Sequence, residues 1–101
     1  MKDFEIAGHH IRLDHGAMKI MGKHTGLDAL DPMRGMTDNE AVLATIMYGG
    51  LARVDMKAER PVRYSYDEVL AMLDDFSQGE LAAIVDAWNQ TKIVETQKKS
   101  E

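Results

Sequence analysis

The chain has 101 residues, of which 45% are hydrophobic and 29% are charged, and it contains no cysteine. A chain of this length normally folds as one domain, and the missing thiols exclude disulfides, thiolate metal sites and a cysteine nucleophile. The net charge of −5 argues against a nucleic-acid-binding protein, which needs a basic surface. No segment is long and apolar enough to cross a membrane, and we expect no signal peptide.

The first fourteen residues predict a β-hairpin. Apolar and polar residues alternate on both sides of the dipeptide Gly8-His9. A glycine in the first position of a two-residue loop is typical of a type II′ turn. This loop would pair Ile6 with Ile11 and Phe4 with Leu13, which places the four apolar side chains on one face of the hairpin.

Four helices are predicted after the hairpin. The first has an apolar stripe from Ala17 to His24 and ends at Gly26, since glycine readily adopts the left-handed conformation that ends helices. The three later helices each begin with the pattern S/T-x-x-E, the capping box, in which the hydroxyl and the glutamate each accept a hydrogen bond from a backbone N–H. These boxes begin at Thr37, Ser65 and Ser77.

The elements together predict an α+β fold, in which an N-terminal β-hairpin is followed by about four α-helices around one core. The single domain is expected to cover residues 1–96, and the polar residues 97–101 are expected to fray. The edges of the hairpin can pair with a strand of another copy, so a homo-oligomer is a candidate assembly.

No catalytic or cofactor-binding motif is recognisable, so we expect neither enzymatic activity nor a cofactor. His9, His10 and His15 are the candidates for a metal site. Adjacent residues of a strand point to opposite faces, however, so His9 and His10 are poorly placed to share a metal ion. We therefore expect exposed histidines near the turn and no metal, and a histidine-dependent metalloenzyme is the less favoured alternative.

Four of the twelve basic residues lie close together in the sequence, at Arg53, Lys57, Arg60 and Arg63. A solvated loop is the expected explanation of this cluster, and a docking surface for an acidic partner is the alternative. The eight methionines are many for this length. Methionine fills gaps in cores and also serves adaptable binding surfaces, and Met56 is predicted to lie at an edge where it could contact a partner.

Several local sequences follow one another in a characteristic order. The hairpin of residues 4–13 is followed by Thr25-Gly26 after the first helix, by Tyr48-Gly49-Gly50-Leu51, and by helices that begin at Ser65 and Ser77. This order resembles the small tail assembly chaperones of long-tailed bacteriophages, and the resemblance covers residues 4 to about 95.

The resemblance implies a phage or prophage protein made in the host bacterial cytoplasm. It implies that the protein binds the tape measure protein, helps to recruit tail tube protein and is absent from the finished virion. A small structural tail component retained in the virion is the alternative. Genes of this family often yield a longer product by frameshifting, and Lys98-Lys99 is compatible with a slippery sequence there.

A chaperone of this kind needs apolar side chains that can cover the stripe of a partner helix. Ile93 and Val94 lie away from the apolar stripe of the last helix, and Leu27 and Leu30 lie in the connection after the first helix. The alternative for Leu27 and Leu30 is that they cover the core beneath the hairpin. The candidate partner-binding residues are Leu27, Leu30, Met33, Met36, Ile93 and Val94.

Overall fold

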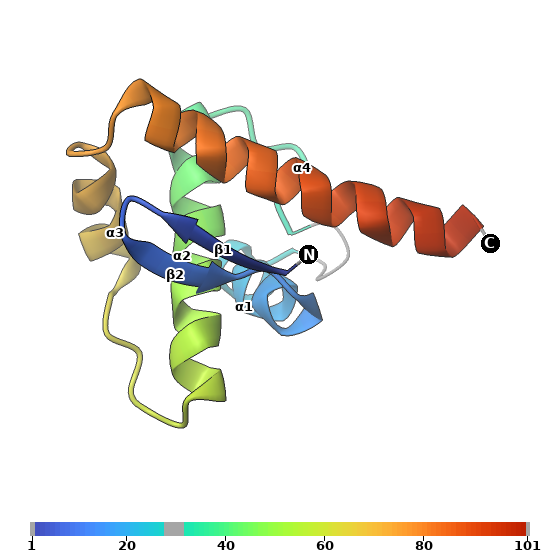
Figure 1. Cartoon of the computed structure of the whole chain (residues 1–101), viewed down its shortest axis with the longest axis horizontal. Coiled ribbons are helices and arrows are strands. Elements are labelled where there is room, and N and C mark those ends of the chain that lie inside the picture. Colours follow the sequence, from blue (N-terminus) through green and yellow to red (C-terminus); the bar gives the residue numbers. More distant parts are fainter. Residues whose placement is uncertain (1, 28–31, 101) are drawn as a thin grey trace.

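The computed structural model describes residues 2–27 and 32–100, with side chains up to residue 91, and this part of the chain is α+β as predicted (Figure 1). A two-stranded antiparallel sheet precedes the helices. The last helix includes residues 97–100, which the sequence analysis assigned to a frayed tail. The elements are β1 (Asp3–Ile6), β2 (His9–Arg12), α1 (His15–Thr25), α2 (Asn39–Lys57), α3 (Tyr66–Leu73) and α4 (Gln78–Ser100).

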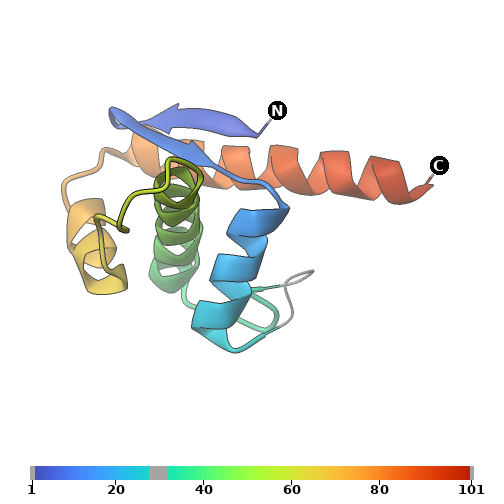
Figure 2. The same cartoon turned by 90° about the horizontal axis from the view of Figure 1, so that it is seen from below.

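Helix α2 is the central element. Helices α1 and α3 flank it on opposite sides, and the hairpin and α4 cross over it (Figure 2). Buried residues occur on several sides of α2, so burial extends beyond the single apolar stripe predicted from the sequence. A helix that neighbours surround in this way needs no single apolar face.

The hairpin closes through a different loop from the predicted one. β1 and β2 pair in the register Phe4↔Ile11 and Ile6↔His9, so the loop is Ala7-Gly8. Both loop residues have positive φ, 52° and 81°, as in a type I′ turn, whose twist matches that of the strands. The predicted Gly8-His9 loop is therefore wrong by one residue. Moving the loop by one residue shifts the strand pairing by two residues. The apolar side chains therefore still share the inner face, because a shift of two keeps each side chain on the same side of the sheet.

Two glycines let neighbouring elements approach the backbone of α2. A Cβ atom added to Gly50 would lie 2.8 Å from Cβ of Ile11, and one added to Gly49 would lie 2.5 Å from Cγ of Met21. Ile11 and Met21 are both fully buried. The hairpin and α1 therefore pack against α2 at positions where it has no side chain.

Side-chain caps set the starts of α3 and α4 as predicted. The Glu68 N–H donates to Oγ of Ser65 at 3.1 Å, and the Ser65 N–H donates to Oε1 of Glu68 at 3.0 Å. Ser77 and Glu80 form the same reciprocal pair. Both capping boxes therefore satisfy backbone N–H groups that a helix start leaves without partners.

The start of α2 differs from the prediction. Its N-cap is Asp38, whose carboxylate accepts hydrogen bonds from the N–H groups of Glu40 and Ala41. The capping box predicted at Thr37 is wrong, because aspartate caps helices as well as threonine does and lies one position closer to the helix. The end of α1 is as predicted, with Gly26 at φ 78°.

We expect Gly50→Ala to lower the free energy of unfolding by about 1–3 kcal/mol, because the new methyl group would overlap the branched Cβ of Ile11. Gly79→Ala is the matched control. Only Oγ of Ser77, at 3.9 Å, lies near a Cβ there, so alanine should stabilise α4 by up to about 1 kcal/mol. Urea denaturation followed by circular dichroism measures both. Equal effects of the two substitutions would contradict close packing at Gly50.

Candidate functional site

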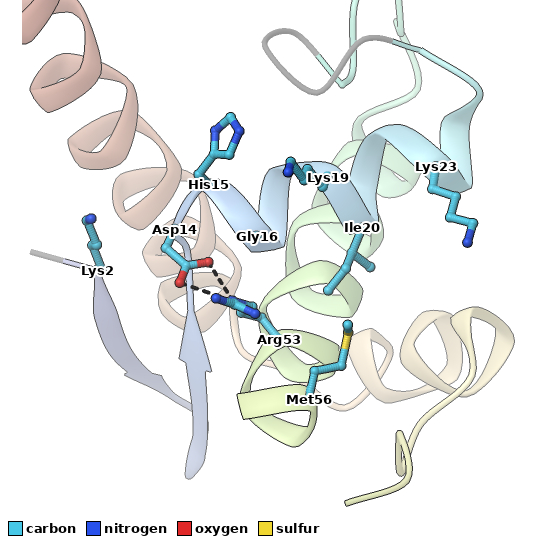
Figure 3. Close-up of a pocket in the computed structure, with 9 residues that line it drawn as sticks. All are labelled: Lys2, Asp14, His15, Gly16, Lys19, Ile20, Lys23, Arg53 and Met56. Carbon is cyan, nitrogen blue, oxygen red and sulfur yellow. Dashed lines mark hydrogen bonds and ion pairs between the residues drawn. The ribbon is translucent and has the colours of Figure 1, made fainter. Parts of the chain in front are cut away.

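A depression of about 580 Å³ opens between α1 and the C-terminal half of α2 (Figure 3). A second depression of about 390 Å³ adjoins it, because both are lined by Ile20, Lys23 and Met56. The second also reaches Tyr48 on α2 and Val62 in the loop after α2. We call the two depressions together the α1–α2 groove.

The floor of the α1–α2 groove is apolar. Ile20 of α1 is half-buried, and the side chains of Ile20 and Met56 point toward one another across the groove (Figure 3). Met56 is 52% exposed and Val62 is 45% exposed. Large apolar side chains exposed side by side in a hollow are typical of a surface that binds another molecule.

The Asp14 carboxylate anchors one end of the groove. Asp14 is buried and caps α1 by accepting a hydrogen bond from the Ala17 N–H at 2.9 Å. It also accepts from Nε of Arg12 at 2.8 Å and from Nε of Arg53 at 2.9 Å. Burial alone would raise the pKa of Asp14, but the hydrogen bonds from Ala17, Arg12 and Arg53 outweigh it and lower this pKa to about 2. Asp14 is therefore anionic at neutral pH and fully paired.

Arg53 is held in place by more than its ion pair with Asp14. A Cβ atom added to Gly16 would lie 2.5 Å from Cζ and Nε of Arg53. The guanidinium group therefore lies directly against the backbone of α1, where only glycine leaves room for it. Gly16 and Asp14 together fix the Arg53 side chain between α1 and α2.

The rim of the groove is cationic. Lys2, Lys19 and Lys23 line it and are exposed. None of these lysines forms an ion pair with another described residue, and Asp14 is the one carboxylate among the described lining residues. Since Arg53 and Arg12 already neutralise Asp14, the groove has a surplus of positive charge on a chain whose net charge is −5.

The arginines of the basic cluster are used within the protein. Asp55 of α2 is fully buried and accepts hydrogen bonds from Nε of Arg60 at 2.7 Å and from Nε of Arg63 at 2.8 Å. Burial would raise the pKa of Asp55, but the Arg63 N–H and the two guanidinium groups lower it below its usual range. Arg60 and Arg63 therefore tie the loop after α2 to the helix. The loop itself is exposed to solvent, as expected from the sequence.

The three candidate histidines lie in different environments. The changed hairpin register places His9 on the inner face, where its ring centroid lies 5.9 Å from that of Tyr64 and 6.4 Å from that of Phe76. The expectation that His9 is exposed is therefore wrong. His10 and His15 are exposed. No group of three His, Asp or Glu side chains among the described residues is placed to hold a metal ion.

A separate hollow of about 370 Å³ lies between the N-terminal halves of α2 and α4. Val42, Leu43, Leu81 and Val85 line it, and Val85 is 41% exposed. It lacks the cationic rim of the α1–α2 groove, since no basic residue lines it. It is a further candidate surface, mainly apolar, with Asn39 and Gln78 as its polar lining residues.

The partner-binding residues predicted from the sequence do not line the α1–α2 groove where the structure describes them. Leu27 is 39% exposed, Met33 is half-buried and packs against the core, and Met36 is half-buried. Leu30 and the side chains of Ile93 and Val94 lie outside the described part of the chain.

One residue of the groove, Met56, was recognisable in the sequence as an edge methionine. Ile20 was instead assigned to the core stripe of the first helix. The sequence does not mark Lys19 and Lys23 as binding residues. Their one common feature is a spacing of four residues, which places them on one side of α1 beside Ile20.

No model of a known protein family matches the chain, and neither a curated protein nor a solved structure matches it. The groove is therefore interpreted from its own geometry. In the described part of the chain, no helix combines the length and the apolar character that crossing a membrane requires.

We expect Asp14→Asn to lower the free energy of unfolding by about 2 kcal/mol at neutral pH, because asparagine can still cap α1 but cannot pair with Arg12 and Arg53 as an anion. The folded-state pKa is below the usual 3.8, so this stabilisation is complete above about pH 4 and is lost as the pH falls toward 2.

Denaturation of both proteins across this pH range tests the expectation. Asp14→Ala is the companion variant, and it should lose about 1 kcal/mol more because the cap is removed as well. A difference between wild type and Asp14→Asn that stays constant from neutral pH to pH 2 would contradict the role given to the charge.

Proposed function

We propose that the protein is a tail assembly chaperone of a long-tailed phage or prophage. In this role it binds the tape measure protein and helps to recruit tail tube protein in the cytoplasm of the host bacterium. The observation that carries the proposal is the α1–α2 groove, which is lined by half-buried Ile20 and by exposed Met56 and Val62. Such a surface can cover the apolar stripe of a partner helix, and the flexible side chain of Met56 tolerates variation in that stripe.

The sequence features behind the family resemblance have structural roles in this chain. Gly8 belongs to the hairpin loop, Gly26 ends α1, Gly49 and Gly50 allow close packing on α2, and Ser65 caps α3. Each feature has a structural role, so the resemblance concerns residues that determine the fold. The function rests on the groove and on this likeness together.

The geometry of the groove favours binding over catalysis. Asp14 is held as an anion by three hydrogen-bonding partners, and its pKa of about 2 makes it a poor proton donor or acceptor at neutral pH. His15 lines the same depression but points away from Asp14 and Arg53 (Figure 3). A role in binding needs neither group to react.

Co-expression with the tape measure protein encoded by the same genome tests the proposal, followed by pull-down and size-exclusion chromatography. We expect a soluble complex that Met56→Asp reduces about tenfold or more, because aspartate would place a charge on the apolar floor. Leu27→Asp and Val85→Asp are the matched controls, since both replace an exposed apolar residue outside the groove.

The controls also compare the candidate surfaces. Loss of the complex through Leu27→Asp alone would move the site to the connection predicted from the sequence, and loss through Val85→Asp alone would move it to the hollow between α2 and α4. Failure of the folded wild-type chain to bind the tape measure protein would refute the proposed function. Detection of the chain in purified phage particles would favour the alternative, a structural tail component.

A further inference from the structure

We infer that the α1–α2 groove binds an acidic amphipathic helix of its partner, with the apolar stripe of that helix on Ile20, Met56 and Val62 and its carboxylates on Lys2, Lys19 and Lys23. The inference rests on the proposed function and deepens it, because it states the chemistry of the segment that the groove accepts.

Charge complementarity identifies an acidic occupant. Lys19 and Lys23 are exposed on the rim and form no ion pair with another described residue. The Asp14 carboxylate cannot satisfy them, because it already accepts hydrogen bonds from Ala17, Arg12 and Arg53. A basic partner segment would meet like charges here, whereas glutamate or aspartate would meet three lysines that form no ion pair within the described residues.

The walls of the groove identify a helical occupant. Both walls are helices, α1 and α2, whose backbone groups bond within each helix. The groove therefore offers no row of backbone donors and acceptors to which an extended peptide could add as a strand. Ile20 lies on α1 beside Lys19 and Lys23, which suits a partner helix that is apolar on one side and charged on its flank.

The spacing of the lysines matches the repeat of a helix. Lys19 and Lys23 are four residues apart on α1, which is about 6 Å along its axis. Carboxylates at positions i and i+4 of a partner helix repeat at the same distance when that helix lies alongside α1. The 11 residues of α1 limit the contact to about three turns of the partner helix.

The apolar floor argues against nucleic acid as the occupant. Phosphates would pair with the lysines but would leave Met56 and Val62 uncovered, and these side chains are 52% and 45% exposed. A protein helix covers both parts of the groove at once. We therefore propose a protein helix as the occupant, and binding of nucleic acid is a result that would contradict this inference.

A pair of designed peptides tests the inference without the natural partner. Both have about 15 residues and the same helical stripe of leucines, with flanks of glutamate in one and of lysine in the other. Fluorescence anisotropy with the full chain measures binding. We expect the acidic peptide to bind more tightly than the basic one, and we expect its affinity to fall as salt is added.

The double variant K19E/K23E should weaken binding of the acidic peptide about tenfold or more, because each lysine becomes a repulsive charge. The single variant Lys23→Glu should show part of this loss. Lys57→Glu is its matched control, since Lys57 is also exposed on a last helical turn but lines neither depression, and it should change the affinity less than about twofold. Circular dichroism verifies that each variant is folded.

A charge exchange separates direct pairing from a structural effect. The basic peptide should bind K19E/K23E more tightly than it binds the wild type, which damage to the fold would not produce. Equal binding of the two peptides, no binding of either, or tighter binding of a single-stranded RNA oligonucleotide would overturn the inference. Any of these results leaves the proposed function standing if the tape measure protein is still captured, so the two failures are distinguishable.

Discussion

The rest of the structure depends on the close approach of the hairpin and α1 to α2 at Gly49 and Gly50. A two-stranded hairpin is only marginally stable in water, and Ile11 anchors this one where α2 has no side chain. The contact of Met21 with Gly49 holds α1 along α2, so that Arg53 lies against Gly16 and Met56 faces Ile20. The α1–α2 groove is thus a consequence of how the core packs.

The local signals in the sequence predict most of the fold, because caps and turn residues act over a few positions. Ser65 and Ser77 cap their helices as expected, and Gly26 ends α1. The errors arise where two neighbouring residues can serve the same role. Gly8 suits either position of the two-residue loop. The observed register also adds a hydrogen bond, in which the Leu13 N–H donates to the Lys2 carbonyl oxygen at 2.8 Å, and this bond lengthens the strand pairing.

The candidate site is less predictable than the fold, because its parts are distant in the sequence. Ile20 reads as a core residue of an amphipathic helix, and only the packing of α1 on α2 leaves it half-buried beside Met56. His9 gives the opposite case, since a polar residue near a turn lies against Tyr64 and Phe76 on the inner face. The periodicity of the sequence indicates which face of a helix or strand is apolar. The exposure of each side chain depends in addition on which other elements pack against it.

Arginines and lysines have different roles in the described part of this chain. Arg53 and Arg63 bind the carboxylates of Asp14 and Asp55, and the planar guanidinium group suits such pairs at the edge of a core. Lys19 and Lys23 remain on the surface, where their charge acts only within about 10 Å at ordinary salt. An acidic chain can therefore present a basic groove, since the internal pairs remove the negative charge that would otherwise cancel the lysines. The net charge of −5 repels an acidic partner weakly at a distance, and the local charge of the groove attracts it once the surfaces touch.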